Sequence, residues 1–305
     1  MQNCNIIVKN ELDCCEILRL TKKDIERPYL EKLFHLIQIY EMEIFMNKYG
    51  KNIIFAVIVA LSLTVVAQAN AIEFGARGYV WFPDQRKSDI QAVADGSDTS
   101  NINTKDMLGI GNKATYSVEA FGGMGKNHVS LMYTPFGYSS DNLLSAAVNY
   151  SGSTFNAGTT VRSELAYSMF DLKYQRDLIN MENILAGFSL GGILQLKYST
   201  GSFKMSSGAN GFEQTRSFDS LIPMIGVGAH VGLLAKLLEL RAQATAGGYG
   251  SGNYSYEAMA DLSLTPFPFV DIHAGYRLLQ LKMNVNDYKM DTLYTGPYLG
   301  LTVGF

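Results

Sequence analysis

The chain has 305 residues, a net charge of −3 at pH 7 and three cysteines, Cys4, Cys14 and Cys15. This charge balance argues against nucleic acid as a partner, and the remaining sequence offers no disulfide framework or cysteine metal site. Charged residues make up only 17% of the chain, whereas Gly (29), Tyr (18) and Phe (16) are abundant. A soluble chain usually has about a quarter of its residues charged. The composition favours a β-rich protein that is not fully solvated, and we expect no cofactor.

Residues 1–45 are charged and carry all the cysteines. We predict that they are a mis-called or non-structural N-terminal extension and that translation starts at Met46. A genuine cytoplasmic extension is the alternative, because residues 24–45 could form an amphipathic helix.

Residues 46–71 have the three parts of a secretory signal peptide. The start "MNKYGK" is positively charged, residues 53–66 are almost entirely apolar, and Ala69 and Ala71 form a small-x-small cleavage site. A transmembrane helix needs about 20 apolar residues, which is longer than this run. We therefore predict cleavage before Ile72, with an uncleaved N-terminal anchor as the alternative.

From residue 72 onward, apolar and polar residues alternate with a period of two. Most of the alternating runs are longer than the five or six residues usual in globular sheets. They also meet the length of about 9–11 residues with which a tilted strand crosses a bilayer. The ten predicted strands lie near residues 72–82, 108–122, 127–138, 164–176, 184–199, 218–233, 238–249, 254–265, 269–283 and 292–305.

The predicted connections alternate in length. Short ones, such as "GMGKN" and "PFPF", follow the even-numbered strands, and longer polar ones, such as residues 84–106 and 139–161, follow most odd-numbered strands. Short turns at one rim and long loops at the other are typical of bacterial outer-membrane barrels. We predict an all-β, transmembrane antiparallel β-barrel over residues 72–305, with about 10 strands or, as a second choice, 8.

Aromatic residues favour the membrane barrel over a soluble β-sandwich, because amphipathic rings suit the membrane interface. We expect one aromatic rim near the short turns, formed by Phe121, Phe267, Phe269 and Phe305. We expect the other near the long loops, formed by Tyr79, Trp81, Phe82, Tyr133, Phe136, Tyr138, Tyr198, Tyr249, Tyr254 and Tyr294.

The signal peptide ending "AQANA", the alternating strands, "AGYRLLQLK" (274–282) and the final "YLGLTVGF" carry a family resemblance. Together they resemble the small outer-membrane β-barrel superfamily of Gram-negative bacteria, the porin-like and opacity-like proteins. The resemblance implies that the last strand, ending in Phe305, is read by the barrel-assembly machinery. Outer-membrane lipid and that machinery are therefore expected partners, with long loops extracellular and both mature termini periplasmic.

Charged residues on the polar strand faces should point into the lumen, because an Arg or Lys facing lipid at mid-depth costs about 2–4 kcal/mol. In a narrow lumen, opposite charges should pair and fill the space. A conducting pathway or a binding site is the sharper alternative. The predicted lumen charge network comprises Glu73, Arg77, Glu119, Asp171, Lys173, Glu239, Arg241, Glu257, Asp261, Asp271 and Arg277.

Two short motifs raise an enzyme hypothesis. Asp271 and His273 have the Asp-x-His spacing of omptin proteases, but the chain lacks the Asp-x-Asp element that this family also uses. His128 and Ser130 have the His-x-Ser spacing of lipid A deacylases, without the rest of that pattern. The histidines are scattered, so no metal site is predicted.

We therefore predict a non-enzymatic outer-membrane barrel whose long extracellular loops serve surface interaction or envelope integrity. An extracellular ligand would be a further partner. A narrow porin-like channel for small or apolar solutes is the alternative function, and an outer-membrane enzyme is the third.

Overall fold

The structure is a computed structural model. It describes residues 72–92, 100–181, 187–208, 211–234, 237–250, 252–285 and 287–305. The predicted extension (1–45) and signal peptide (46–71), with its cleavage residues Ala69 and Ala71, lie outside the described residues. Within these described ranges, no helix is long and apolar enough to cross a membrane.

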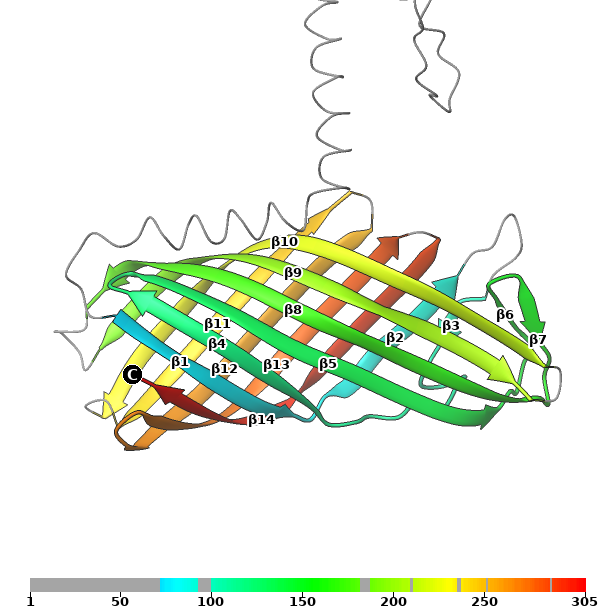
Figure 1. The fold of residues 1–305 in the computed structure, drawn as a ribbon, viewed down its shortest axis with the longest axis horizontal. Helices are drawn as coiled ribbons and strands as arrows, with labels where there is room; N and C mark the ends of the chain where they lie inside the picture. Colours follow the sequence, from blue (N-terminus) through cyan, green and yellow to red (C-terminus); the bar gives the residue numbers. More distant parts are fainter. Residues whose placement is uncertain are drawn as a thin grey trace, which may run out of the picture. The chain divides into compact units, whose positions relative to one another are not determined.

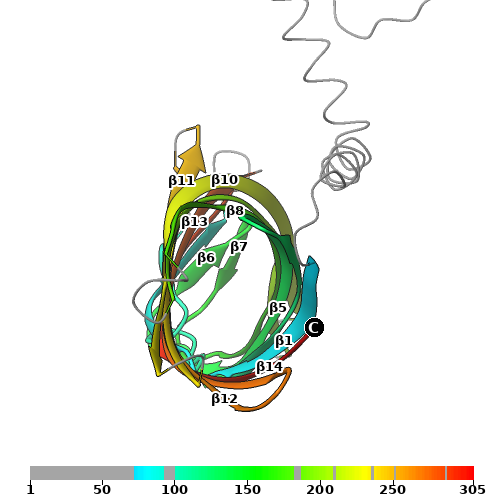
Figure 2. The same cartoon turned by 90° about the vertical axis from the view of Figure 1, so that its left-hand side faces the viewer.

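Ten long strands form the wall of a barrel (Figure 1). They are β1 (Ile72–Trp81), β4 (Thr115–Met124), β5 (Asn127–Leu143), β8 (Thr160–Asn180), β9 (Phe188–Ser207), β10 (Phe212–Leu234), β11 (Leu238–Tyr249), β12 (Asn253–Phe267), β13 (Val270–Val285) and β14 (Tyr288–Gly304). Each pairs antiparallel with its neighbour along the chain, and β14 pairs back with β1 from Gly75↔Gly304 to Trp81↔Tyr298. The ring is therefore closed (Figure 2), which confirms the predicted ten-stranded antiparallel barrel.

The strands alternate between lumen and exterior as their period of two predicts. On β14, Leu299 and Leu301 are 58% and 49% exposed, whereas Tyr298 and Thr302 are 1% and 3% exposed. A closed wall satisfies its backbone hydrogen bonds internally, so its outer face can be apolar and contact lipid. The apolar outer face is the one expected of a membrane barrel.

Several wall strands, including β5, β8, β9 and β10, are longer than predicted. β9 and β10 contain 20 and 23 residues and pair as far as Ser207↔Phe212, so much of the segment expected to be a polar loop is barrel wall. The outward residues change from Tyr198 and Leu221 to polar ones such as Thr200 and Asp219 towards this end. Strands pair through their backbones, and this pairing requires no apolar face. β9 and β10 therefore continue the wall beyond the apolar part of the exterior that suits lipid.

We call the end with the turns β4–β5, β8–β9, β10–β11 and β12–β13 the short-turn end, and the opposite end the long-loop end. Two long connections remain at the long-loop end, and both contain strands. β2 (Asp84–Ala92) continues past Pro83 and pairs with β14, and β3 (Ile102–Asn103) pairs with β2. Pro83 has no N–H to donate, which accounts for the break between β1 and β2.

The second long connection crosses the mouth of the barrel. It contains the hairpin of β6 (Val148–Tyr150) and β7 (Ser153–Phe155), seen within the barrel outline in Figure 2. Tyr150 is fully buried, and its hydroxyl donates to the Phe203 carbonyl on β9 at 3.0 Å. Arg216 Nε on β10 donates to Ser151 Oγ at 2.7 Å. The hairpin is thus packed and hydrogen-bonded to the wall tips rather than forming an open loop.

The predicted aromatic rim at the long-loop end is wrong for several of its members. Trp81, Phe136, Tyr138 and Tyr294 are at most 5% exposed because they occupy lumen-facing positions of their strands. Their rings pack together, with Phe136 4.5 Å from Tyr167 and 5.4 Å from Tyr294 between centroids. Rings and methionines therefore fill this half of the lumen and form one hydrophobic core with β2, β3 and the β6–β7 hairpin.

The single tryptophan gives a direct test of this filled lumen. Trp81 is 1% exposed, donates its Nε1–H to the Gly296 carbonyl at 3.2 Å, and lies under the Arg277 guanidinium. We expect acrylamide to quench its fluorescence weakly in the folded barrel and strongly after unfolding in urea. Efficient quenching in the folded state would contradict a filled lumen.

Candidate functional site in the barrel lumen

The middle of the lumen holds a buried charge cluster, Asp171, Lys197, Glu257 and Arg277. Lys197 Nζ lies 2.5 Å from Asp171 Oδ1 and 2.9 Å from Glu257 Oε2. Arg277 NH2 lies 2.7 Å from Glu257 Oε1. The cluster has two cations and two carboxylates, and each side chain is at most 4% exposed. Short, balanced ion pairs of this kind offset the cost of removing the charges from water.

Strand register explains only part of this cluster. Asp171 and Lys197 are direct partners on the neighbouring strands β8 and β9. Glu257 lies on β12, and β10 and β11 separate that strand from β9 in the ring. The Lys197–Glu257 contact therefore joins parts of the wall that are three strands apart in the ring.

A second charged group lies nearer the short-turn end. Glu119 is 3.4 Å from Arg77 NH1 and 3.6 Å from Lys173 Nζ, and it accepts a hydrogen bond from the Tyr79 hydroxyl at 3.3 Å. The Arg77 guanidinium lies 4.1 Å from the centre of the Phe121 ring. Alternation places these side chains on the lumen faces of β1, β4 and β8.

A third group lies on the neighbouring strands β11, β12, β13 and β14. Arg241 Nε is 3.4 Å from Asp261 Oδ1, and the other carboxylate oxygen of Asp261 accepts from the Tyr298 hydroxyl at 2.8 Å. His273 Nδ1 is 3.2 Å from Asp261 Oδ1, and its Nε2 is 2.6 Å from Thr302 Oγ1. His273 is 1% exposed, so its contacts with Asp261 and Thr302 are shielded from solvent.

Two histidines and their acidic partners line the lumen closest to the short-turn end. His128 lies between two carboxylates, with Nδ1 2.7 Å from Glu73 Oε1 and Nε2 3.4 Å from Asp177 Oδ2. His230 Nε2 lies 3.4 Å from Glu239 Oε2. The Glu73 side chain is 52% exposed and that of His128 is 33% exposed, so solvent reaches this level of the barrel.

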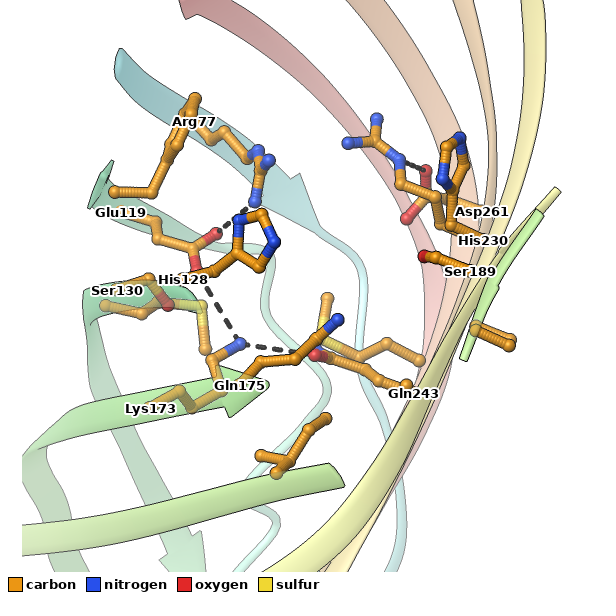
Figure 3. A pocket seen from close by; sticks show the side chains of 18 of the residues that line it. Arg77, Glu119, His128, Ser130, Lys173, Gln175, Ser189, His230, Gln243 and Asp261 are labelled. Atoms are coloured by element: carbon orange, nitrogen blue, oxygen red, sulfur yellow. Dashed lines mark hydrogen bonds and ion pairs between the residues drawn. The ribbon is translucent and has the colours of Figure 1, made fainter. Parts of the chain in front are cut away.

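The last three groups surround a cavity of about 310 Å³ (Figure 3). Side chains from β1, β4, β5 and β8 face side chains from β10, β11 and β12 across it. Gln175 and Gln243 extend between the two sides, and Lys173 Nζ donates to Gln243 Oε1 at 3.5 Å. The lumen thus has a filled half and a solvent-accessible polar half.

The structure distributes the predicted network residues among these groups. Asp171, Glu257 and Arg277 meet in the middle, while Arg77, Glu119 and Lys173 meet on one side of the cavity. The remaining predicted residues are Glu73 and Glu239, each beside a histidine, the Arg241–Asp261 pair, and Asp271, which accepts from Thr265 Oγ1 at 2.6 Å.

Sequence reasoning missed Lys197, the cation at the centre of the cluster. The alternation in "ILQLKYS" (193–199) places Lys197 on the same face as Ile193 and Gln195, and that face is the lumen face. The signal was therefore present in the sequence. Asp177, His128 and His230 were likewise absent from the predicted network, although each occupies a lumen-facing alternate position.

The two enzyme motifs have separate partners. Asp271 pairs with Thr265, whereas His273 contacts Asp261, Thr302 and Arg241. His128 lies between two carboxylates. Across the described part of the chain, no group of three or more His, Cys, Asp or Glu side chains is arranged to hold a metal ion.

A closed antiparallel barrel with an apolar exterior and a charged, side-chain-filled lumen is the architecture of a transmembrane β-barrel, as found in bacterial outer membranes. The chain matches no protein-family model and no curated protein. Among solved structures, it resembles the outer membrane protease OmpT of Escherichia coli at 12% identity, covering 76% of this chain and 97% of that chain with a TM-score of 0.48.

Two further solved structures have similar coverage. One is Ail, the attachment invasion locus protein of Yersinia pestis, in complex with the heparin analogue sucrose octasulfate (15% identity, 77% and 99% coverage, TM-score 0.34). The other is the toluene transporter TodX of P. putida (7% identity, 78% and 90% coverage, TM-score 0.29). The likeness is one of barrel architecture.

Proposed function

We propose that this protein is a non-enzymatic outer-membrane barrel, closed to solute flow, that presents a rigid surface at its long-loop end. The observation that carries the proposal is the hydrophobic core at that end. It joins the barrel wall, the β2–β3 segment and the β6–β7 hairpin, including the fully buried Ile90, Ile102, Val148 and Phe155. Loops packed in this way form an ordered surface suited to extracellular contacts or to envelope integrity.

Closure to solutes is supported by the contents of the lumen. Phe136, Tyr167 and Tyr294 pack ring against ring, and Phe218 stacks on Tyr288 at 4.9 Å between centroids. Burying each large apolar side chain contributes about 1.5–3 kcal/mol. A pathway would have to displace several of these rings as well as the buried charge cluster.

Polar groups on the outside of the long-loop end support its exposure to water. Outward ion pairs include Arg162 Nε to Glu164 Oε1 at 2.6 Å and Lys204 Nζ to Glu213 Oε2 at 2.9 Å. In our proposal this end is extracellular, and the short turns, Ile72 and Phe305 are periplasmic. Such an orientation keeps the charged exterior out of lipid, where Arg and Lys are costly.

The C-terminal residue fits the proposed role in assembly. The Phe305 N–H donates to the Phe74 carbonyl at 2.8 Å, and its ring lies 5.3 Å from that of Phe269. Phe305 is 62% exposed, so a partner could contact it at the seam between the first and last strands. We propose that the barrel-assembly machinery reads this end of β14.

A non-enzymatic role is supported by the surroundings of the Asp261–His273–Thr302 arrangement in the lumen. His273 and Thr302 are 1% and 3% exposed, and neither lines the cavity. A substrate would have no direct approach to the Thr302 hydroxyl, because a nucleophile must come within about 3–3.5 Å of the reacting atom.

Planar-bilayer recordings test whether the lumen is closed to the flow of ions and small solutes. We expect the purified protein to give no discrete conductance steps, because rings and ion pairs fill the lumen. A variant lacking residues 148–155 of the hairpin is the informative comparison, since it opens the mouth while leaving the wall strands unchanged. Regular steps from the unaltered protein would instead establish the narrow-channel alternative.

Cysteine labelling tests orientation in the same strain background. Ala146→Cys lies in the exposed long connection and Lys126→Cys lies in an exposed short turn. A membrane-impermeant maleimide should label Ala146→Cys in intact cells and Lys126→Cys only after the outer membrane is permeabilised. The reverse pattern would overturn the proposed orientation.

A further inference from the structure

The cavity separates charge along the barrel axis. Its inner part, which we call the floor, contains three cations and two carboxylates and so has a net charge of +1. The floor residues are Arg77, Lys173, Arg241, Glu119 and Asp261. Its outer part, which we call the rim, contains three carboxylates and two imidazoles. The rim residues are Glu73, Asp177, Glu239, His128 and His230. The net charge of the rim is −3 with both imidazoles neutral and −1 with both protonated, so the rim is negative in either state.

The ion pairs of the floor cations are longer than those of Lys197 in the buried charge cluster. The Arg77–Glu119, Lys173–Glu119 and Arg241–Asp261 ion pairs measure 3.4, 3.6 and 3.4 Å. In the cluster, the contacts of Lys197 measure 2.5 and 2.9 Å. The long separations leave the floor cations with capacity for another anionic partner, because a charge-assisted N–H···O bond is typically 2.7–2.9 Å long.

Two guanidinium N–H groups at the floor have unmet hydrogen-bonding capacity. Among the described residues, neither Arg77 Nε nor Arg241 Nε makes a hydrogen bond, although Arg241 Nε lies 3.4 Å from Asp261 Oδ1 in an ion pair. Arg241 NH2 also contacts the His273 ring, 3.3 Å from Nε2. Both arginines line the cavity, one from each side. Buried polar groups in native proteins almost always have a partner. Arginine presents its N–H groups as a fork that matches a carboxylate.

The geometry points to a ligand site, and we propose that the cavity binds a small soluble zwitterion. Its carboxylate would lie between Arg77 and Arg241, and its ammonium group would lie towards Glu73, Asp177 and Glu239. A single carboxylate balances the floor's net charge of +1, and an ammonium offsets the excess of carboxylates at the rim. The inference goes beyond the proposed surface role and does not depend on it.

Size and spacing select an extended zwitterion. The cavity volume of about 310 Å³ is at the lower end of the usual range for ligand sites. Glu73 and Arg77 are four residues apart on β1, which is about 13 Å along a strand. Side chains of the floor and the rim extend into the cavity and shorten this distance between the charged groups. A ligand whose charges are separated by several methylene groups therefore fits better than an α-amino acid does.

Isothermal titration calorimetry on the protein purified from membranes in detergent micelles tests the proposal with three matched probes. They are 6-aminohexanoate, hexanoate, which lacks the ammonium, and hexylamine, which lacks the carboxylate. We expect 6-aminohexanoate to bind at least tenfold more tightly than either singly charged probe. Equal binding of hexanoate, or no binding of 6-aminohexanoate at millimolar concentration, would overturn the proposal without any variant being needed.

Charge-neutralising variants assign the two ends of the ligand. Arg77→Gln should weaken binding of 6-aminohexanoate and hexanoate about tenfold, whereas Glu73→Gln should weaken only 6-aminohexanoate. Lys282→Gln is the matched control, because its side chain is on the outer surface and 41% exposed. Weak quenching of Trp81 by acrylamide would verify that each variant retains the folded barrel. Unchanged affinity in folded Arg77→Gln would place any binding elsewhere and contradict the proposed site.

Discussion

Replacing Lys197 by Met is expected to lower the free energy of unfolding of the barrel by about 3–5 kcal/mol. The substitution removes the shared partner of Asp171 and Glu257, both of which are buried in the middle of the lumen. Removing one member of a buried ion pair leaves an uncompensated charge in a medium of low dielectric constant, and that loss has the stated magnitude. Urea unfolding in lipid vesicles, followed by Trp81 fluorescence, measures the change.

Lys204→Met is the matched control on the same strand. Lys204 also forms one short ion pair, 2.9 Å from Glu213, but its side chain is 34% exposed and that of Glu213 is 60% exposed. Exposed pairs contribute about 0–1 kcal/mol, so this variant should unfold almost like the parent. Similar losses in the two variants would contradict the assignment of a special role to the buried charge cluster.

Replacing Phe136 by Ala is expected to cost about 3–5 kcal/mol, the usual range for deleting a buried aromatic side chain. Phe136 is 3% exposed and contacts the rings of Trp81, Tyr167 and Tyr294 at centroid distances of 6.1, 4.5 and 5.4 Å. The loss should appear in the same urea titration. The cavity left beside Trp81 should also increase quenching by acrylamide.

Phe170→Ala, on the neighbouring strand β8, is the matched control. It distinguishes the loss of packing in the lumen from the loss of an aromatic side chain on the outside of the barrel. Phe170 faces outward, is 38% exposed, and packs on Tyr133 at a centroid distance of 5.0 Å. We expect a loss of about 1 kcal/mol, the value of one aromatic pair, with unchanged quenching of Trp81. If Phe136→Ala were as mild as Phe170→Ala, the lumen would not be filled as described.

The period of two in the sequence was enough to predict the barrel and the face on which its charges lie. Asp171, Glu257 and Arg277 were expected in the lumen because lipid would not tolerate them, and each is at most 4% exposed inside the barrel. The same rule applied to "ILQLKYS" identifies Lys197 as a lumen residue. The side of the wall to which a residue points can be read from the local sequence, because successive side chains of a strand point to opposite sides.

Strand length and loop structure were predicted less well. The tips of β9 and β10 carry polar residues on the outward face, so their alternation is weak and they resemble loop sequence. They are nevertheless strands because the two tips pair with each other as far as Ser207↔Phe212. The β6–β7 hairpin is only three residues on each side, and its burial depends on β9 and β10 being long enough to reach it.

The sequence by itself determined the inward and outward faces and the lipid-compatible exterior and favoured ten strands over eight, since these follow from local alternation. Only the tertiary structure decided which lumen residues meet. Lys197 and Glu257 are 60 positions apart and are brought into contact across the barrel. Several aromatic residues expected at a membrane rim, including Trp81, Phe136 and Tyr294, fill the lumen instead. Closure and the stagger between strands set the level of each side chain along the axis, and alternation carries no information about that level.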